Sequence, residues 1–511
     1  MIEIANKKIF TKNFFILGGL VLVGLALRLM LDKTMGYFWF DEAFSVHFSS
    51  MDFSNMTRYI VFDNHPLFFP AVLNGWIKLF GNQEFVVRLL SVAFGLLSII
   101  TIYFLGREMV NKKTGLIAAF LLTITPYSLY YTTEARMYGM LLFFILLSTL
   151  FYWKILKQPT VLNSVIFSLS TFCLLHTHLL AVIIVFLFNI FYFINYFYYK
   201  NKKLKIISWF YIQFLLFISY AWWLAIFIYL RIKYIFPLLD EKNIWFLKTY
   251  FLNNNFFNLI VKGVIFNNYV DYYLEPLVNS FILFIFLAFL SIRFIKHNEF
   301  RIKIETSPEK IFLLIVFLVI TLMGFVFQKP LLRYYVLCLP AIYLLLSAGL
   351  AKLGRRALLV IIFCFVLVVI TSYQKNFLLI GNNKELIQYL ESATQTDSKT
   401  KIMNHIFDYQ IILDKYYTGR AEVEGFYPWD DMPDKNYRYI IKNYQRGLVN
   451  EENVNRLAES AKGYEKIIFI FTTNYEEENN LIMDWFESHD YQITSAESID
   501  SKRVITFVLN D

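Results

Sequence analysis

The chain has 511 residues, of which 58% are hydrophobic and 19% aromatic, and it carries a formal net charge of +9. Ordinary soluble domains contain roughly 45–50% apolar residues, so this composition excludes the soluble class and predicts a membrane protein. The lysines and arginines lie in short clusters between apolar runs, as they do in loops beside a membrane. This distribution argues against a nucleic-acid partner.

Apolar runs long enough to cross a bilayer, which takes about 20 residues as a helix, recur along the first 373 residues. The sequence predicts about eleven such helices, near residues 14–31, 86–105, 115–131, 138–153, 161–176, 179–197, 206–230, 277–295, 311–328, 332–350 and 357–373. Their backbone groups need hydrogen-bond partners within the segment, which helices provide. We therefore expect residues 1–373 to form an all-α polytopic membrane domain.

Basic loops alternate with less basic ones along this domain. With the N-terminus inside, the positive-inside rule assigns the basic loops to the cytoplasmic side: 107–113, 154–157, 200–205, 293–310 and 352–356. The segments left on the outer side are 32–85, 125–136, about 231–276, and everything after Tyr373. The pattern predicts a multi-pass protein of the cytoplasmic membrane whose distinctive residues face outward.

Residues 374–511 differ from the membrane part. Apolar strands such as Lys466–Thr472 and Val504–Leu509 alternate there with amphipathic stretches such as Lys384–Ser392. Such alternation is typical of an α/β domain. We expect one soluble extracytoplasmic domain.

Two adjacent acids, Asp41 and Glu42, lie among aromatic residues a few positions beyond the first predicted span. The simplest interpretation is an aromatic belt at the membrane interface with two solvated carboxylates. The functional interpretation is that one carboxylate accepts a proton from an acceptor hydroxyl while its neighbour supports it. Aromatic surroundings limit water around such a base.

Further ionisable residues occur at the outer ends of later spans. His65 follows Asp63, Arg88 lies at the start of the second span, and Glu134-Ala135-Arg136-Met137-Tyr138 forms the next outer turn. A cation at the headgroup level can pair with a lipid phosphate, although snorkelling explains any one of them equally well.

Two histidines, His176 and His178, end the fifth predicted span. A spacing of two residues points their rings to nearly opposite faces of a helix. A metal site shared by this pair is therefore not favoured. A hydrogen-bonded interfacial histidine is the simplest interpretation of His178, with a substrate contact as the alternative.

Four motifs in a fixed order carry a resemblance to a known family: Asp41-Glu42, Asp63 to Leu67, Phe80 to Leu89, and Glu134 to Tyr138. Together they resemble the bacterial members of the dolichyl-phosphate-mannose protein mannosyltransferase family, in the GT-C class of membrane glycosyltransferases. The resemblance covers about the first 200 residues. One departure is that Leu67 follows Pro66 directly, where the family has a second proline.

The resemblance implies a GT-C fold and transfer of a sugar from a polyprenyl-phosphate donor to a hydroxyl on a protein, lipid or glycan. It implies that Asp41 is the base and Glu42 its partner. It also implies roles in binding the donor phosphate or the substrate for His65, Arg88, Glu134, Arg136, Tyr138, His178 and Arg333. No cofactor is evident from the sequence, and a divalent cation is left open.

Because a phosphate is a good leaving group, the reaction needs mainly a base and nearby cations. A single displacement of that kind inverts the anomeric centre. Two alternatives share these sequence features: a transporter or flippase of lipid-linked sugars, and a catalytically idle scaffold that binds a partner through its C-terminal domain.

Overall fold

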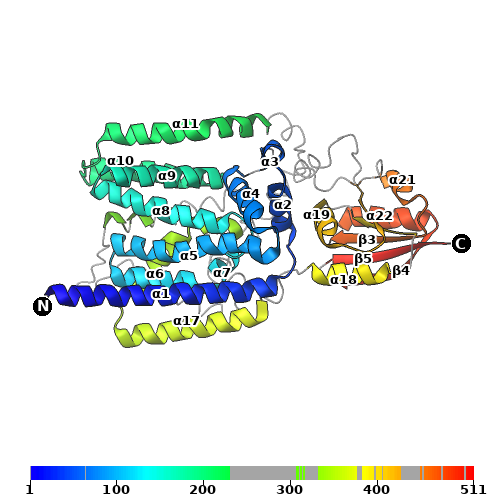
Figure 1. The fold of residues 1–511 in the computed structure, drawn as a ribbon, viewed down its shortest axis with the longest axis horizontal. Helices are drawn as coiled ribbons and strands as arrows, with labels where there is room; N and C mark the ends of the chain where they lie inside the picture. Colours follow the sequence, from blue (N-terminus) through cyan, green and yellow to red (C-terminus); the bar gives the residue numbers. More distant parts are fainter. Residues whose placement is uncertain are drawn as a thin grey trace, which may run out of the picture.

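The computed structural model has a bundle of helices followed by a small sheet domain beyond one end of the bundle (Figure 1). The structure describes residues 2–61, 63, 65–230, 307–309, 311–313, 315–316, 332–376, 383–395, 399–404, 407–426, 449, 451, 454–472, 476–499 and 502–510.

The bundle is built from long helices joined by shorter ones. The long helices are α1 (Ile2–Met35), α5 (Glu84–Met109), α6 (Lys112–Ile124), α8 (Tyr138–Lys157), α9 (Val161–Thr177), α10 (Ala181–Phe193), α11 (Ile206–Leu230), α16 (Leu339–Leu350) and α17 (Arg355–Asn376). The shorter ones are α2 (Phe40–Ser49), α3 (Phe53–Ile60), α4 (Phe68–Phe80), α7 (Pro126–Tyr131), η1 (Ile194–Tyr198) and η5 (Leu332–Leu337).

Within the described ranges, 5 helices are long and apolar enough to cross a membrane. Shorter apolar helices accompany them at Phe68–Phe80, Val161–Thr177 and Leu339–Leu350. The predicted membrane class and helical fold are therefore confirmed.

Three predicted spans differ in detail. The run predicted at 332–350 is η5 followed by α16, and the run predicted at 179–197 is α10 followed by η1. The run predicted at 115–131 is two helices, because α6 ends at Ile124 and α7 begins at Pro126. Proline has no N–H to donate and its ring clashes with the preceding turn, so it begins helices rather than continuing them. The predicted span at 277–295 and most of that at 311–328 lie outside the described residues.

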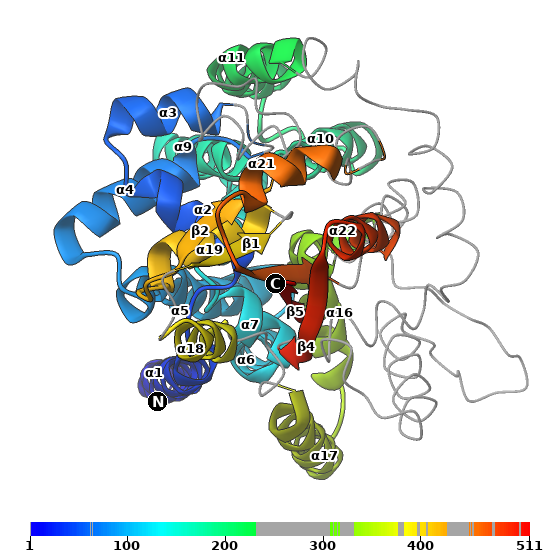
Figure 2. The same cartoon turned by 90° about the vertical axis from the view of Figure 1, so that its right-hand side faces the viewer.

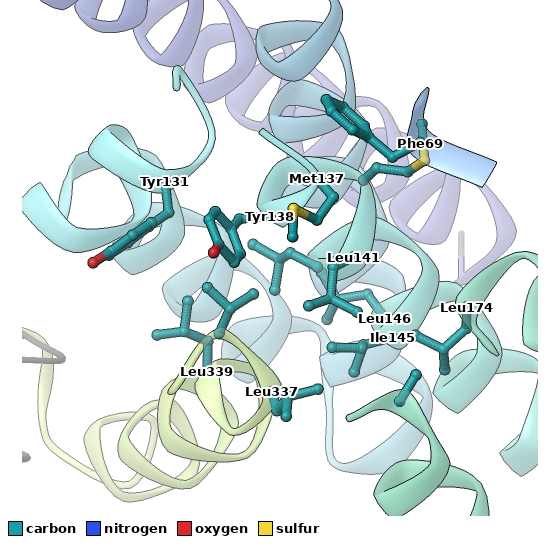
Figure 3. Packing of buried hydrophobic residues seen from close by; sticks show 14 of the residues in the cluster. Phe69, Tyr131, Met137, Tyr138, Leu141, Ile145, Leu146, Leu174, Leu337 and Leu339 are labelled. Carbon is teal, nitrogen blue, oxygen red and sulfur yellow. The ribbon is translucent and has the colours of Figure 1, made fainter. Parts of the chain in front are cut away.

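Close packing holds the bundle together. A Cβ on Gly106 of α5 would lie 2.8 Å from the Cα of Gly115 in α6, so only small residues allow this approach. Figure 3 shows buried apolar side chains of the core, among them Phe69, Met137 and Leu141. This core supports the loops that carry the predicted site.

The N-terminus and the sheet domain lie at opposite ends of the bundle (Figure 1). The short helices α2, α3 and α4 lie at the end nearest the sheet domain, and α4 exposes Leu79 and Phe80 near its end. The 125–136 turn lies at this end too, as the number of intervening helices requires. Both of these predicted outer segments therefore meet at one end of the bundle.

The C-terminal domain has a five-stranded sheet in the order β2-β1-β3-β5-β4. Its elements are α18 (Lys384–Ala393), β1 (Thr400–Asn404), α19 (Phe407–Tyr416), β2 (Glu422–Gly425), η8 (Val454–Arg456), α21 (Leu457–Ala461), β3 (Lys466–Thr472), α22 (Glu476–Ser488), β4 (Tyr491–Ile499) and β5 (Lys502–Leu509). Strand β1 is parallel to β2 and β3, whereas β5 is antiparallel to β3 and β4. The helix α19 packs against α2 of the bundle, and Figure 2 shows the domain in front of that end.

Candidate functional site

The acid pair lies in the first turn of α2. Trp39 is the N-cap in extended conformation, and the Glu42 carboxylate accepts from its backbone N–H at 3.4 Å. This bond resembles half of a capping box, and the helix dipole favours acids at this position. Gly36, with a φ of 59°, turns the chain between α1 and α2 in a conformation that glycine adopts without strain.

Glu42 is completely buried, and both of its oxygens are occupied by protein donors. Arg88 donates from Nε to Oε1 at 2.8 Å and from Nη2 to Oε2 at 2.6 Å. The backbone N–H of Ala135 donates to Oε1 at 2.8 Å. The bidentate pair is strong and geometrically specific, and it joins α2, α5 and the 132–137 turn. Glu42 is therefore placed to hold the site together rather than to take a proton from substrate.

Arg88 is only 1% exposed. Besides Glu42, its Nη1 donates to the carbonyl of Gly36 at 2.9 Å and lies 3.4 Å from Asp32 in α1. These partners occupy the guanidinium inside the protein. The arrangement therefore does not favour the predicted contact between Arg88 and a donor phosphate. It favours a structural role in which Arg88 holds the acidic turn against α5.

Asp41 is placed differently from its neighbour, because 14% of its side chain is exposed. Its Oδ2 is paired with Arg333 of η5, which itself is 28% exposed. Its Oδ1 accepts no hydrogen bond from the described residues. Arg136 donates from Nη1 to the Asp41 carbonyl at 3.2 Å and to the Ser45 hydroxyl at 2.7 Å. Two arginines therefore flank a carboxylate with one available oxygen.

Glu134 forms a buried wall behind this group. Trp39 Nε1 donates to its Oε1 at 3.0 Å, while its Oε2 is buried and has no hydrogen-bond partner among the described residues. Burial, followed by the nearby charges of Glu42 and Asp41, raises the pKa of Glu134 to about 8. The carboxyl is therefore neutral at neutral pH.

We predict that Glu134→Gln stabilises the protein increasingly as pH rises. The pKa of Glu134 is about 8 in the fold against an ordinary value of 4.5. The stability that its bound proton gives is therefore full below pH 4.5 and lost progressively up to about pH 8. Glutamine does not ionise. The difference in the free energy of unfolding between Glu134→Gln and the natural protein should therefore widen between these two pH values by a few kcal/mol, at about 1.4 kcal/mol per pKa unit.

Thermal unfolding of detergent-purified protein between about pH 5 and pH 9 measures this difference. The same substitution at Glu487, which is exposed on α22, is the control. A difference between Glu134→Gln and the natural protein that does not change with pH would contradict the burial of an unpaired carboxyl.

Two histidines from separate loops meet at the other side of the site. His65 Nδ1 lies 3.1 Å from Asp63 Oδ2, and its ring centroid is 5.1 Å from that of His178. The Nδ1 of His178 accepts from the backbone N–H of Leu180 at 3.1 Å, so we assign the proton to Nε2. Burial and the nearby His65 lower the pKa of His178 well below its usual range. His178 is thus a neutral donor.

Several buried donors in this region have no hydrogen-bond partner in the part of the chain that the structure describes: His178 Nε2, Arg136 Nε and the Tyr138 hydroxyl. Buried polar groups are nearly always paired in proteins, so unpaired donors gathered in one region indicate a site that a polar ligand completes. His176, in contrast, lies near carbonyls of Phe172 and Ser219, apart from His178 in its contacts. The two histidines form no joint site.

A small pocket, partly open to solvent, lies near Asp41. It is lined by Phe44, Ser45, Ile60, Asp63, His65, Phe69, Pro70, Arg136, Met137 and Thr177. Arg136 connects the pocket to Asp41 through the bond to its carbonyl. The pocket is therefore apolar on one part of its wall and carries both charge signs on another.

Sequence reasoning missed two charged residues of the first span, Arg28 and Asp32. Arg28 is fully buried and donates to the Thr132 hydroxyl at 2.8 Å, while Asp32 contacts Arg88. A charged residue within a membrane helix is costly and generally functional or paired. Arg28 lies inside the predicted run 14–31 and Asp32 directly follows it, so the buried arginine was a usable signal.

Possible metal ligands do not cluster among the described residues. In the part of the chain that the structure describes, no three His, Cys, Asp or Glu side chains group closely enough to hold one. The open prediction of a divalent cation thus gains no ligand set from these residues.

Comparison with known proteins shows a fold and a partial match to one family model. Residues 64–224 match the model of the dolichyl-phosphate-mannose-protein mannosyltransferase family. No curated protein matches the chain.

Solved structures match over nearly the whole chain at low sequence identity. ArnT from Cupriavidus metallidurans bound to undecaprenyl phosphate aligns with a TM-score of 0.57 and 12% identity, covering 95% of this chain and 97% of ArnT. The oligosaccharyltransferase AglB from Archaeoglobus fulgidus, in complex with an inhibitory peptide and a dolichol-phosphate, aligns with a TM-score of 0.53 and 12% identity, covering 94% and 72%. The resemblance to GT-C proteins and the predicted GT-C fold are therefore confirmed.

Proposed function

We propose that this chain, which has the GT-C fold, transfers a sugar from a polyprenyl-phosphate donor to an acceptor hydroxyl. The observation that carries the proposal is the half-buried Asp41 carboxylate, which has one oxygen available and the other paired with Arg333. A base beside a cation is what displacement of a phosphate by a hydroxyl needs. The family match over residues 64–224 supports the same chemistry.

The proposed reaction is a single displacement. The acceptor oxygen attacks the anomeric carbon, the bond from that carbon to the phosphate oxygen breaks, and Asp41 takes the hydroxyl proton. The lipid phosphate departs with the bonding electron pair. Because the attack comes from the side opposite the leaving group, the anomeric centre inverts, and NMR of the product linkage checks this. A retained configuration would contradict it.

We assign the departing phosphate to the cations and hydrogen-bond donors that lie around Asp41. Arg333 is the most exposed of the arginines around Asp41, and Arg136 and His178 offer buried donors without partners. Charge-assisted hydrogen bonds to phosphate are among the strongest that proteins form. ArnT has been captured with undecaprenyl phosphate and AglB with a dolichol-phosphate, which supports a lipid phosphate as the ligand here.

Arg333→Ala is expected to raise the KM for the lipid donor by about 10- to 100-fold, because a hydrogen bond to a charged group contributes about 1.5–3 kcal/mol. Steady-state transfer at varied donor concentration measures the change. Arg107→Ala removes the same charge from the opposite end of the bundle and is the control. An unchanged KM in Arg333→Ala would move the phosphate elsewhere in the site.

We further propose that the site faces the outside of the cytoplasmic membrane. The segments that carry it, 32–85 and 125–136, are those that the positive-inside rule assigns to the outer side. The acceptor, whether protein, lipid or glycan, then reaches the pocket from the side of the C-terminal domain.

The competing function is a flippase or transporter of lipid-linked sugars. An assay in liposomes that contain the purified protein and a labelled polyprenyl-phosphate sugar distinguishes the two functions. The assay includes an acceptor mixture and is run with and without chelator. A transferase separates the label from the lipid, whereas a flippase moves intact donor between leaflets. Movement without donor breakdown would overturn the proposed function.

A further inference from the structure

The C-terminal domain hydrogen-bonds the backbone of the acidic turn at Phe38. The hydroxyl of Tyr416, at the end of α19, accepts from the Phe38 N–H at 3.0 Å. Asn383, just before α18, donates from Nδ2 to the Phe38 carbonyl at 2.9 Å. Both backbone polar groups of one residue in the turn are therefore bonded by a separate domain.

The Tyr416 hydroxyl also connects this turn to the helix that carries Arg88. It donates to the Glu84 carboxylate, one helical turn before Arg88 on α5. Arg88 in turn binds the carbonyl of Gly36 and the carboxylate of Glu42. Tyr416 therefore bonds both the acidic turn, at Phe38, and α5, at Glu84. Because Arg88 of the same helix also bonds the acidic turn, the three parts are connected to one another.

Apolar and cationic contacts reinforce this hydrogen bonding. The ring of Tyr416 stacks on Tyr37 with centroids 4.2 Å apart and planes 5° from parallel. Lys415 Nζ lies 5.2 Å from the centroid of the buried Phe38 ring. Lys502 of β5 donates to Asn383 Oδ1 at 2.8 Å, which holds that amide in place.

Phe38 lies in the turn, and Asp41, three positions later, lies in the first turn of the helix α2 that follows. The orientation of Phe38 therefore sets where α2 begins and where the Asp41 carboxylate points. We propose that Tyr416 is a positioning residue for Asp41, through which the C-terminal domain forms part of the transferase centre. This inference rests on the proposed function. It requires no contact between Tyr416 and substrate.

Tyr416→Phe tests the proposal in the full-length protein, because it removes the hydroxyl but keeps the ring that stacks on Tyr37. We expect kcat to fall about 10-fold with the donor KM unchanged, since small misplacements of a reacting group cost up to about 10²-fold. The matched control is Tyr464→Phe, which removes a hydroxyl bonded to a carboxylate, Glu422, on the exposed side of the same domain. The control should keep the natural kcat.

A double variant separates positioning from general destabilisation. If Tyr416 acts through Asp41, adding Tyr416→Phe to Asp41→Asn should lower the residual rate no further, because residues that act as a unit are not additive. An equal fold loss in both backgrounds would overturn the proposal.

Hydrogen–deuterium exchange provides a readout that does not depend on transfer. Exchange of the peptide containing Phe38 should be faster in Tyr416→Phe and unchanged in Tyr464→Phe. Unchanged exchange in both variants would overturn the contact between Tyr416 and Phe38. Faster exchange with a natural kcat overturns positioning but leaves the proposed function standing. If the natural protein consumes no donor, the proposed function fails and positioning fails with it, whereas the exchange result still decides the contact.

Discussion

Asp41→Asn should reduce the rate of sugar transfer by at least about 100-fold, the lower end of what a general base contributes. The amide has the same shape as the carboxylate but cannot accept the hydroxyl proton. Because the Asp41 side chain is partly exposed, losing its ion pair with Arg333 should cost under about 1 kcal/mol of stability. The variant is therefore expected to be folded and to bind the lipid donor.

The control for this variant is Asp52→Asn. Asp52 is another acid of the same 32–85 segment, where it caps α3 through the N–H of Asn55. It lies outside the pocket lining and should tolerate the change with near-natural transfer. Turnover of well-folded Asp41→Asn within a few-fold of the natural protein would remove Asp41 from the role of base.

Glu42→Gln should instead act on folding. Glu42 is buried with Arg88, and removing one partner of a buried ion pair leaves an uncompensated charge at a cost of about 3–5 kcal/mol. We expect a large fall in thermal stability, or loss of monodisperse protein in detergent, and the loss of transfer should follow the loss of fold. Fluorescence-detected size exclusion after heating measures the stable fraction.

Glu108→Gln is the matched control, because Glu108 pairs with Lys157 in an ion pair that is 33% and 40% exposed. Exposed pairs contribute under about 1 kcal/mol, so this variant should melt near the natural temperature. If Glu42→Gln proved as stable as Glu108→Gln and yet inactive, Glu42 would belong to the chemistry rather than to the scaffold.

The membrane helices were largely predictable from the sequence because lipid imposes a strong local condition. A spanning helix needs a contiguous apolar run, and the run near 138–153 accordingly lies within α8, Tyr138–Lys157. The break at Pro126 was missed because an apolar run was extended through a residue that cannot continue a helix. The strand predicted at Lys466–Thr472 coincides with β3. Its run of isoleucine and phenylalanine is also a local signal, typical of a buried strand.

The site was predictable only as a set of residues. The order of motifs pointed to Asp41, Glu42 and Arg88, and the family resemblance pointed to Arg333, but no local pattern tells which acid pairs with which arginine. Packing of α2 against α5 buries Glu42 with Arg88, whereas η5, from a distant part of the chain, brings Arg333 to Asp41. The roles of two adjacent acids therefore diverge for reasons that lie in tertiary structure.

Tyr416 illustrates what the sequence does not reveal. It lies in a domain with no motif of the resemblance, and its partners Phe38 and Glu84 are more than 300 positions away in the chain. Its contact depends on how the C-terminal domain docks on the bundle. Only the folded arrangement connects that domain to the acidic turn.

The proposed transferase consumes a polyprenyl-phosphate sugar with Asp41 as the base. The most direct measurement compares the natural protein and Asp41→Asn in liposomes that contain the labelled donor and an acceptor, by counting free polyprenyl phosphate released for each sugar transferred. We predict one lipid phosphate per sugar for the natural protein and a release at least about 100-fold slower for the variant. Donor that stays intact with the natural protein, or equal release by both proteins, would contradict the account.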